Sequence, residues 1–340
     1  ESAVEDTSAK ADHKPVDPPL DTFWESERYR QFQTGGLKMF RPTVAEVQRL
    51  HDIPEYDSDG NKTDTFDQLC STLTQANEMG TVYEKGAVLP VARTEAVVEL
   101  KEDATNRKVV SGFAQNNYGQ LANRTIQDET NKLVALNAAE KVGFDDIEYC
   151  SRVMLVPKPS GEWRFCVDLR GVNKNVKIEH WPLTKVDIRL QGMAGSQYFS
   201  TLDLPQAFHN IPLEEESRKY FGFKAPDGLY RYKTLPMGYV NSMALFTRLM
   251  DTSMIGLGDF VSVYVDDLIV FSRSWSEHLQ HLTKVFRRLQ GAGLKVNLAK
   301  CAFAREEVPF LGHLVTREGV KMDATKVAAI DSMPLPDELT

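Results

Sequence analysis

Residues 260–272, which read F-V-S-V-Y-V-D-D-L-I-V-F-S, constrain the fold more than any other stretch of this sequence. Two runs rich in β-branched and aromatic residues, 260–265 and 268–271, flank the adjacent carboxylates Asp266 and Asp267, and such runs are typical of β-strands. The connection between them contains no Gly, Pro or Asn, although these residues are common in turns. The pattern therefore predicts a tight β-hairpin with an acidic tip.

Strand alternation divides the first run of this hairpin between two faces. Ser262, Tyr264 and Asp266 fall on one face, and the valines at 261, 263 and 265 fall on the other, so the hairpin can rest on an apolar layer while it presents a carboxylate. Two unit charges ~4 Å apart repel by about 4 kcal/mol at an effective dielectric near 20. A half-buried acidic pair is therefore expected to share a proton or to bind a cation. The alternative is a solvated polar turn.

The composition is that of an ordinary globular protein. The chain has 340 residues, of which 42% are hydrophobic and 26% charged, and this length suits roughly two domains. No apolar run approaches the ~20 residues of a membrane span, and the acidic start does not resemble a signal peptide. The four cysteines lack C-x-x-C spacing, which argues against a disulfide framework and against a zinc site. We therefore expect an intracellular protein with no membrane partner.

The acidic residues are concentrated in the first part of the chain. Residues 1–150 hold 27 acidic and 16 basic side chains, a balance of −11, whereas residues 151–340 hold 21 acidic and 24 basic side chains, a balance of +3. The net charge of −8 therefore does not exclude a nucleic-acid partner for the second part.

The chain before residue 125 has few clear signals. Residues 1–22 are polar and rich in proline, which predicts a disordered lead. Residues 23–124 form an extension of unknown role, with candidate strands at 87–91, 96–100 and 108–113.

From residue 125 onwards the sequence predicts alternating helices and strands. The predicted helices span 125–142, 183–193, 241–255 and 275–290, and the predicted strands span 152–156, 163–167, 198–202, 220–224, 229–234, 295–298 and 309–315, besides the acidic hairpin. This order indicates an α+β domain whose antiparallel sheet carries helices on one face.

Three carboxylates are the candidates for metal binding. Asp203 follows the strand at 198–202, and margins of two antiparallel strands can be adjacent, so Asp203 can meet Asp266 and Asp267. An all-oxygen site of this kind suits hard divalent ions, and two Mg²⁺ ions about 3.5 to 4 Å apart could serve nucleotidyl transfer. Lys158 and Arg164 lie across one predicted hairpin and could bind a triphosphate; the alternative is a solvated charged surface.

Histidines give weaker signals. His278 and His281 lie three residues apart on a predicted helix, and without a cysteine or a second pair we expect them on a solvated face rather than at a zinc site. We expect His209 and His313 to be hydrogen-bonded structural residues rather than catalytic bases.

Five motifs resemble, in order and approximate spacing, the reverse transcriptase of gypsy-type LTR retrotransposons. They are W-R-F-C-V-D-L-R-G-V-N-K at 163–174, L-D-L-P-Q-A-F-H-N-I at 202–211, L-P-M-G at 235–238, Y-V-D-D at 264–267 and F-L-G-H-L-V-T-R-E-G-V at 310–320. The resemblance covers about residues 130–335. It implies a right-hand polymerase fold with fingers and palm, a largely absent thumb, and RNA-directed DNA polymerase activity.

The resemblance also implies residue roles. Asp203, Asp266 and Asp267 correspond to the catalytic, metal-binding acids, and Phe208 corresponds to an aromatic gate that excludes a 2′-hydroxyl, with a helix core residue as the alternative. The residues implied to bind the nucleotide are Lys158, Arg164, Phe208, Met237, Gly238 and Lys300. Those implied to contact template or primer, or to hold the fingers together, are Asp168, Arg170, Asn173, Phe310, Leu311, Gly312 and His313.

The implied layout divides the chain from residue 125 into fingers (125–177 and 213–238), palm (178–212 and 239–322, which includes the acidic hairpin) and the start of a thumb or connection (323–340). The implied cofactor is a pair of Mg²⁺ ions, with Mn²⁺ as the alternative. The implied partners are deoxynucleoside triphosphates, an RNA or DNA template with a primer, and other segments of a Pol polyprotein, in the cytoplasm within virus-like particles or in the nucleus.

Two departures from the family pattern keep rival interpretations open. The family usually has N-A-P after the L-P-x-G loop, whereas this chain has Asn241, Ser242 and Met243, and residues 1–120 match no family pattern. The rivals are a catalytically inactive or truncated retroelement remnant that binds nucleic acid, and an interaction protein built on the acidic N-terminal region.

Overall fold

The computed structural model describes residues 65–79, 81–83, 92, 94–104, 119–158, 161, 163–182 and 184–322. The expected disordered lead at 1–22, the candidate strands at 87–91 and 108–113, and the expected start of a thumb at 323–340 lie outside these residues.

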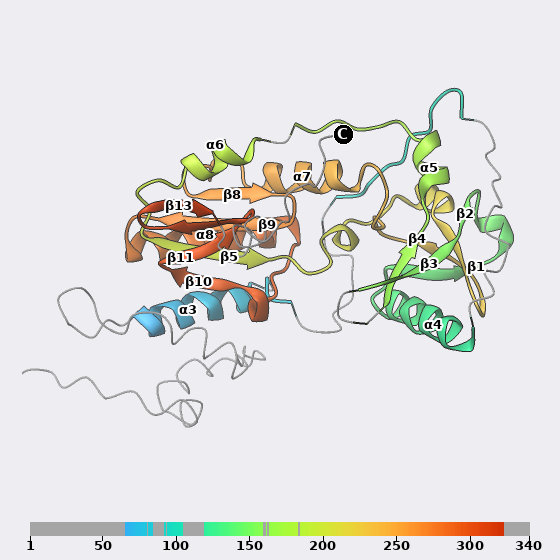
Figure 1. Ribbon diagram of the computed structural model, residues 1–340, viewed down its shortest axis with the longest axis horizontal. Helices are drawn as coiled ribbons and strands as arrows, with labels where there is room; N and C mark the ends of the chain where they lie inside the picture. The colour runs from blue at the N-terminus through green and yellow to red at the C-terminus, as the bar shows by residue number, and fades with distance from the viewer. Residues whose placement is uncertain are drawn as a thin grey trace, which may run out of the picture.

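A four-stranded sheet, which we call the central sheet, carries the acidic hairpin. Its strand order is β10-β5-β9-β8, and all three pairings are antiparallel (Figure 1). The strands are β5 (Tyr198–Asp203), β8 (Val261–Tyr264), β9 (Asp267–Ser272) and β10 (Ala302–Arg305). Their β-branched and aromatic residues alternate between two faces, so each face buries its own apolar set.

Two helices cover one face of the central sheet. The helices α7 (Ser242–Ser253) and α8 (Trp275–Ala292) contribute Phe246, Met250 and Phe286 to the same buried cluster as Val263 and Val270 of the sheet. Ser274 caps α8 through a hydrogen bond from the Glu277 backbone, and Gly293 ends the helix in the left-handed conformation. The predicted antiparallel sheet is therefore confirmed, with its two long helices on one face, although the short helix at 186–191 packs on the other.

The opposite face of the central sheet packs against a second, smaller cluster. Phe199, Ile269 and Phe271 of the sheet meet Val308, Phe310 and Val315, together with Leu190 and Met193. These partners come from α6 (Val186–Gln191) with the turn that follows it, and from a three-stranded sheet of β11 (Glu307–Phe310), β12 (His313–Thr316) and β13 (Gly319–Met322). This packing leaves the β5 and β9 ends with the carboxylates beside the β11–β12 turn.

A second four-stranded sheet, the outer sheet, lies at the far end of the molecule in Figure 1. Its order is β1-β7-β6-β2, from β1 (Ala139–Val142), β2 (Cys150–Ser151), β6 (Gly222–Ala225) and β7 (Gly228–Tyr232). The hairpin of β3 (Val153–Pro157) and β4 (Trp163–Val167) and the helices α4 (Gln120–Ala135) and α5 (Arg170–Asn175) accompany it.

The N-terminal extension contributes a helix that the sequence reasoning missed. Helix α3 (Thr65–Glu78) packs on α8, where the Trp275 indole donates a hydrogen bond of 2.7 Å to Gln68. Leu69, Leu73 and Ala76 are buried, and their i, i+4, i+7 spacing is the signal that could have found this helix. Part of the extension is thus integral to the domain.

Several predicted boundaries are wrong because tertiary pairing overrides local propensity. The helix expected at 125–142 ends at Ala135, and its last residues instead form β1, which pairs with β7. The strand expected at 295–298 is replaced by a single bridge at Val296 and a 3-10 turn, η5 (Leu298–Lys300). The strand expected at 309–315 is the hairpin of β11 and β12. None of the helices in the described part of the chain is long and apolar enough to cross a membrane.

Candidate active site

The acidic hairpin turns over two residues, Val265 and Asp266. Strands β8 and β9 pair Tyr264 with Asp267, so Asp266 lies in the turn and Asp267 begins β9. Val265 has a φ of +56°, a conformation that β-branched residues rarely adopt. The turn therefore holds a strained backbone at the point where the carboxylates project, which is a common property of functional sites.

Asp203 and Asp267 are directly opposite each other on neighbouring strands. The register of β5 against β9 pairs Asp203 with Asp267, Thr201 with Ile269 and Phe199 with Phe271. Residues paired in this way project from the same face of a sheet, with Cβ atoms about 4.5 to 5.5 Å apart. Asp203 and Asp267, which are 64 positions apart in the sequence, are therefore cross-strand neighbours, as the strand margins predict.

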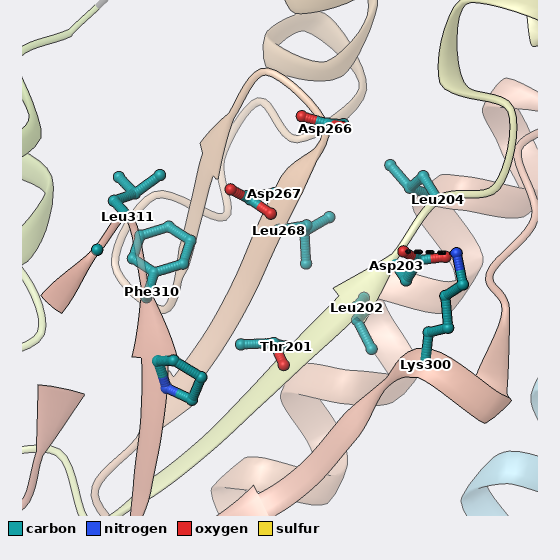
Figure 2. Close-up of a pocket in the computed structure, with 12 residues that line it drawn as sticks. Thr201, Leu202, Asp203, Leu204, Asp266, Asp267, Leu268, Lys300, Phe310 and Leu311 are labelled. Carbon is teal, nitrogen blue, oxygen red and sulfur yellow. Dashed lines mark ion pairs between the residues drawn. The ribbon is translucent and has the colours of Figure 1, made fainter. Parts of the chain in front are cut away.

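These carboxylates open into one cavity of about 280 Å³. Figure 2 shows Asp203 on β5, Asp266 and Asp267 on the hairpin, and Phe310 and Leu311 on the opposite wall. The lining residues are Thr201, Leu202, Asp203, Leu204, Asp266, Asp267, Leu268, Lys300, Pro309, Phe310, Leu311 and Gly312. The structure thus brings together the three predicted acids, the predicted cation and three of the four predicted primer-contact residues.

Burial and mutual repulsion make the carboxylates harder to ionise. Partial burial raises the pKa of Asp203, with a smaller contribution from the charge of Asp266, while Lys300 opposes the shift. Partial burial also raises the pKa of Asp267, and the charges of Asp266 and Asp203 add to the increase. A cation in the cavity would relieve these costs, because it would stabilise the charged forms.

The donor atoms fit a hard divalent cation. The Oδ2 atom of Asp203 is buried, and none of the described residues donates a hydrogen bond to it. Within the described residues, no group of three or more His, Cys, Asp and Glu side chains is arranged to hold a metal ion. Mg²⁺ needs only one or two carboxylates when water and substrate phosphates complete its octahedral shell, and the cavity offers room for them.

Lys300 provides the nearest positive charge. Its Nζ atom lies 4.0 Å from Oδ1 of Asp203, and its side chain is 67% exposed (Figure 2). The ion pair is long and exposed, so the ammonium is available to a ligand in the cavity.

The β11–β12 turn forms the wall facing the acids. Leu311 and Gly312 both have positive φ, +51° and +75°, and Phe310 pairs with His313 across this two-residue turn. Phe310 is buried and anchors the turn, while Nδ1 of His313 donates a hydrogen bond of 3.1 Å to the Leu311 carbonyl. The structural role expected for His313 is confirmed.

Lys158 and Arg164 do not line the cavity. Arg164 lies on β4 opposite Val156 and is exposed, and Lys158 follows β3 at the start of the hairpin loop. The two predicted triphosphate ligands therefore share one hairpin, as the sequence predicts, but the structure places them outside the carboxylate cavity.

Asn173 joins α5 to the loop at 235–241. Its Nδ2 donates to the Gly238 carbonyl at 2.9 Å, and its Oδ1 accepts from the Val240 amide at 3.0 Å. Gly238 has a φ of +87°, which favours glycine, and Met237 beside it is 66% exposed. Asn173 thus fixes the loop that carries two of the predicted nucleotide contacts.

Asp168 and Arg170 form a local pair. The Arg170 guanidinium donates two hydrogen bonds to Asp168, at 2.8 and 2.6 Å, and this contact lowers the pKa of the Asp168 carboxyl. Arg170 remains largely exposed at the surface. The pair orders the segment before α5 and leaves the guanidinium accessible.

Phe208 lies on a 3-10 turn, η3 (Ala207–Asn210), five residues after Asp203. Its ring meets Phe246 edge to face at 5.9 Å and packs against the main core, but it is only half-buried. The structure therefore shows the core contact that the alternative interpretation requires, while Phe208 stays partly exposed.

The expectation of a solvated His278 is wrong. The residue is fully buried, with Nε2 2.7 Å from the Ser200 hydroxyl and Nδ1 2.9 Å from the Ser272 hydroxyl. It shares the core-facing side of α8 with Leu282 and Leu289, a spacing that could have predicted its burial. The expectation holds in part for His281, which is half-buried, hydrogen-bonded to Ser272 and stacked on Phe260. His209 is buried and hydrogen-bonded to Thr234, as expected.

Sequence reasoning missed two residues that shape the site. Asn241 precedes α7, and its side chain bonds to the Glu179 amide and the Lys177 carbonyl rather than capping the helix. Cys301 contacts the backbone of Asp203, as described below. Neither contact has a local sequence signal, because each joins segments more than 60 residues apart.

Comparison with known proteins agrees with this geometry. Residues 156–315 match the family described as reverse transcriptase (RNA-dependent DNA polymerase). The chain is 38% identical over 194 residues to the Pol polyprotein from transposon 297 of Drosophila melanogaster, covering 55% of this chain and 18% of the relative. It is 34% identical over 175 residues to the Pol polyprotein from transposon gypsy of the same species, covering 51% and 17%. The chain thus spans less than a fifth of these relatives.

Solved structures give the same fold. A foamy viral protease-reverse transcriptase in complex with double-stranded DNA matches with a TM-score of 0.68 and 26% identity, over 89% of this chain and 51% of that one. The same kind of protein in complex with an RNA/DNA hybrid matches with a TM-score of 0.68 and 24% identity, over 89% and 39%. The predicted α+β fold of right-hand polymerases is therefore confirmed, and residues 156–315 are similar in sequence to reverse transcriptases, including the Pol polyprotein from transposon gypsy.

Proposed function

We propose that this chain is the polymerase part of a retroelement Pol polyprotein and catalyses RNA-directed DNA synthesis. The observation that carries the proposal is the cross-strand pairing of Asp203 with Asp267, with Asp266 at the adjoining strained turn and all three in one cavity. In this assignment the central sheet belongs to the palm, and the outer sheet and the β3–β4 hairpin belong to the fingers.

Asp203, Asp266 and Asp267 would hold two divalent cations, Mg²⁺ or Mn²⁺. When bound, such ions supply activation of a primer 3′-hydroxyl and charge neutralisation at the transferred phosphate. The protein's own contribution is positioning: cross-strand pairing fixes the acids, and the β11–β12 turn bounds the space opposite them. Lys300 adds positive charge at the same cavity, and Lys158 and Arg164 offer donors for the triphosphate from the β3–β4 hairpin.

The substrates in this proposal are deoxynucleoside triphosphates and an RNA or DNA template with a primer. Complexes of the foamy viral relatives with double-stranded DNA and with an RNA/DNA hybrid support this choice. The partial exposure of Phe208 leaves room for its assignment as a gate against a 2′-hydroxyl. If the assignment holds, Phe208→Ala incorporates ribonucleotides that the wild-type chain rejects; a variant that gains none refutes it.

Primer extension tests the proposed activity. The chain is incubated with a labelled primer on RNA and on DNA templates, with deoxynucleotides and Mg²⁺. We expect extension on both templates that is abolished by EDTA and by Asp203→Asn, whereas Asp259→Asn, which changes an exposed carboxylate in the turn before β8, leaves extension unchanged. Retained primer-template binding with no extension by the wild-type chain would favour the inactive remnant.

A further inference from the structure

Asp203 lies at the end of β5, where the regular pairing of this strand with β10 stops. Strand β10 pairs with β5 at Ala302 opposite Thr201, and continuing this register would set Lys300 opposite Asp203. Lys300 belongs instead to the 3-10 turn η5 and forms no ladder bond with Asp203. The backbone amide and carbonyl of Asp203 therefore need other partners, because buried backbone groups are costly to leave without hydrogen bonds.

Two residues of the turn supply these partners. The Asp203 amide donates to the Cys301 thiol sulfur at 3.3 Å, and the Asp203 carbonyl accepts from the Asn297 amide at 2.9 Å. The Cys301 thiol in turn donates to the Asn297 carbonyl at 3.2 Å. The three residues thus form a closed ring of hydrogen bonds, in which each bond restricts the other two.

The ring of hydrogen bonds connects Asp203, a proposed metal ligand, to the buried side chain of Cys301. Cys301 is 2% exposed and lies immediately before β10, whereas the carboxylate of Asp203 faces the cavity. The same turn carries Lys300, whose ammonium lies 4.0 Å from the Asp203 carboxylate. The turn at 297–301 therefore contacts both the backbone and the side chain of Asp203.

We propose that Cys301 is a positioning residue that sets the backbone of Asp203, and with it the carboxylate that receives the divalent cation. This inference rests on the proposed function, because it assigns Cys301 a part in cation binding at the same site. Cys301 touches no reacting atom; it acts through Asp203. A thiol suits this position because it combines one donor with one acceptor in a small, largely apolar side chain.

The test compares three variants of the full chain. Cys301→Ala removes the thiol that accepts from the Asp203 amide and donates to the Asn297 carbonyl. Cys301→Ser restores a side chain that can make both hydrogen bonds. Cys150→Ala removes an equally buried thiol from β2 of the outer sheet, so it controls for the cavity that the lost sulfur leaves. Three quantities are measured: hydrogen exchange of the Asp203 amide by NMR, the affinity for Mn²⁺ by calorimetry, and the Mg²⁺ dependence of primer extension.

In Cys301→Ala, we expect the amide hydrogen of Asp203 to exchange about 2- to 10-fold faster and Mn²⁺ to bind about 2- to 10-fold more weakly. The free energy of one net hydrogen bond sets this range. Cys301→Ser should recover part of both losses, and Cys150→Ala should show neither. The inference is overturned if Cys301→Ala leaves the Asp203 amide and Mn²⁺ affinity unchanged, or if Cys150→Ala changes them equally. If the wild-type chain extends no primer, the proposed function fails, while amide exchange and Mn²⁺ affinity still decide the role of Cys301.

Discussion

Replacing Asp203 with Asn should make the metal-free protein more stable, not less. Asp203 faces Asp267 directly, burial and repulsion raise the pKa of both carboxyl groups, and Oδ2 of Asp203 has no hydrogen-bond donor among the described residues. Asn has nearly the same shape, carries no charge, and can donate to the Asp267 carboxylate. The substitution removes a repulsion that the proposed cation would otherwise relieve.

The cross-strand geometry gives the size of the effect. Two unit charges about 5 Å apart repel by ~0.8 kcal/mol at a dielectric of 80 and by ~3 kcal/mol at 20. Asp267 is exposed and the Asp203 side chain is 34% exposed, so the repulsion lies near the lower figure, about 1 kcal/mol. Losing the long ion pair with Lys300 costs about 0.2 to 0.5 kcal/mol. The net gain is therefore about 0.5 to 0.8 kcal/mol, or roughly 1 to 3 °C in melting temperature.

Thermal denaturation in EDTA and in saturating Mg²⁺ measures the effect. In EDTA, Asp203→Asn should melt above the wild-type chain and above Asp259→Asn. In Mg²⁺, the wild-type chain should gain about 2.7 kcal/mol at 100 times its dissociation constant, and the variant should gain less, so that the order reverses. A variant that melts below the wild type in EDTA, or that gains as much from Mg²⁺, would refute the reasoning.

Three further outcomes follow from the same contacts. Asn173→Ala removes both hydrogen bonds to the loop at 235–241, so steady-state assays should show a raised KM for the nucleotide. Urea denaturation should show a loss of about 1 to 2 kcal/mol in the free energy of unfolding. Asn175→Ala, which changes a neighbour on the same helix, should leave KM unchanged. Cation binding needs ionised carboxylates, and the pKa of Asp203 and of Asp267 is raised. The Mn²⁺ affinity measured by calorimetry should therefore fall on acidification at pH values where an ordinary Asp stays charged. A pH midpoint of this fall at or below the ordinary Asp pKa would contradict the prediction. Burial lowers the pKa of His278 to about 3, so the unfolded chain takes up a proton below pH 6.5 that the folded chain does not. The free energy of unfolding should therefore fall by up to about 1.4 kcal/mol per pH unit on acidification. Urea denaturation of His278→Gln should show a weaker dependence of this free energy on pH.

The acidic hairpin could be predicted from the sequence because its signal is local. Two short apolar runs around Asp266 and Asp267 specify strands, and period-two alternation specifies which face is buried. The structure adds what alternation does not encode: the turn uses Val265 at positive φ, and Asp267 belongs to a strand instead of the tip. The partner of Asp267 across the sheet, Asp203, could be proposed only from the margins of two predicted strands.

Contacts between distant segments escaped the prediction. The side chain of Asn241 bonds to residues more than 60 positions away, and Cys301 meets Asp203 across 98 positions. The burial of His278 was missed for a different reason, because its position on the core face of α8 shows only when it is grouped with Leu282 and Leu289. Local composition thus predicts the elements and the acids, while the residues that orient them depend on tertiary pairing.

Anomalous diffraction from crystals grown with Mn²⁺ tests the central claim most directly. The account predicts Mn²⁺ peaks in the cavity between Asp203 and Asp266, with an oxygen of each carboxylate as ligands, and predicts that crystals of Asp203→Asn lose them. The proposed polymerase chemistry would be contradicted if saturating Mn²⁺ gave no peak in this cavity. It would also be contradicted if Mn²⁺ bound there equally well in Asp203→Asn, because the cation site would then not depend on this carboxylate.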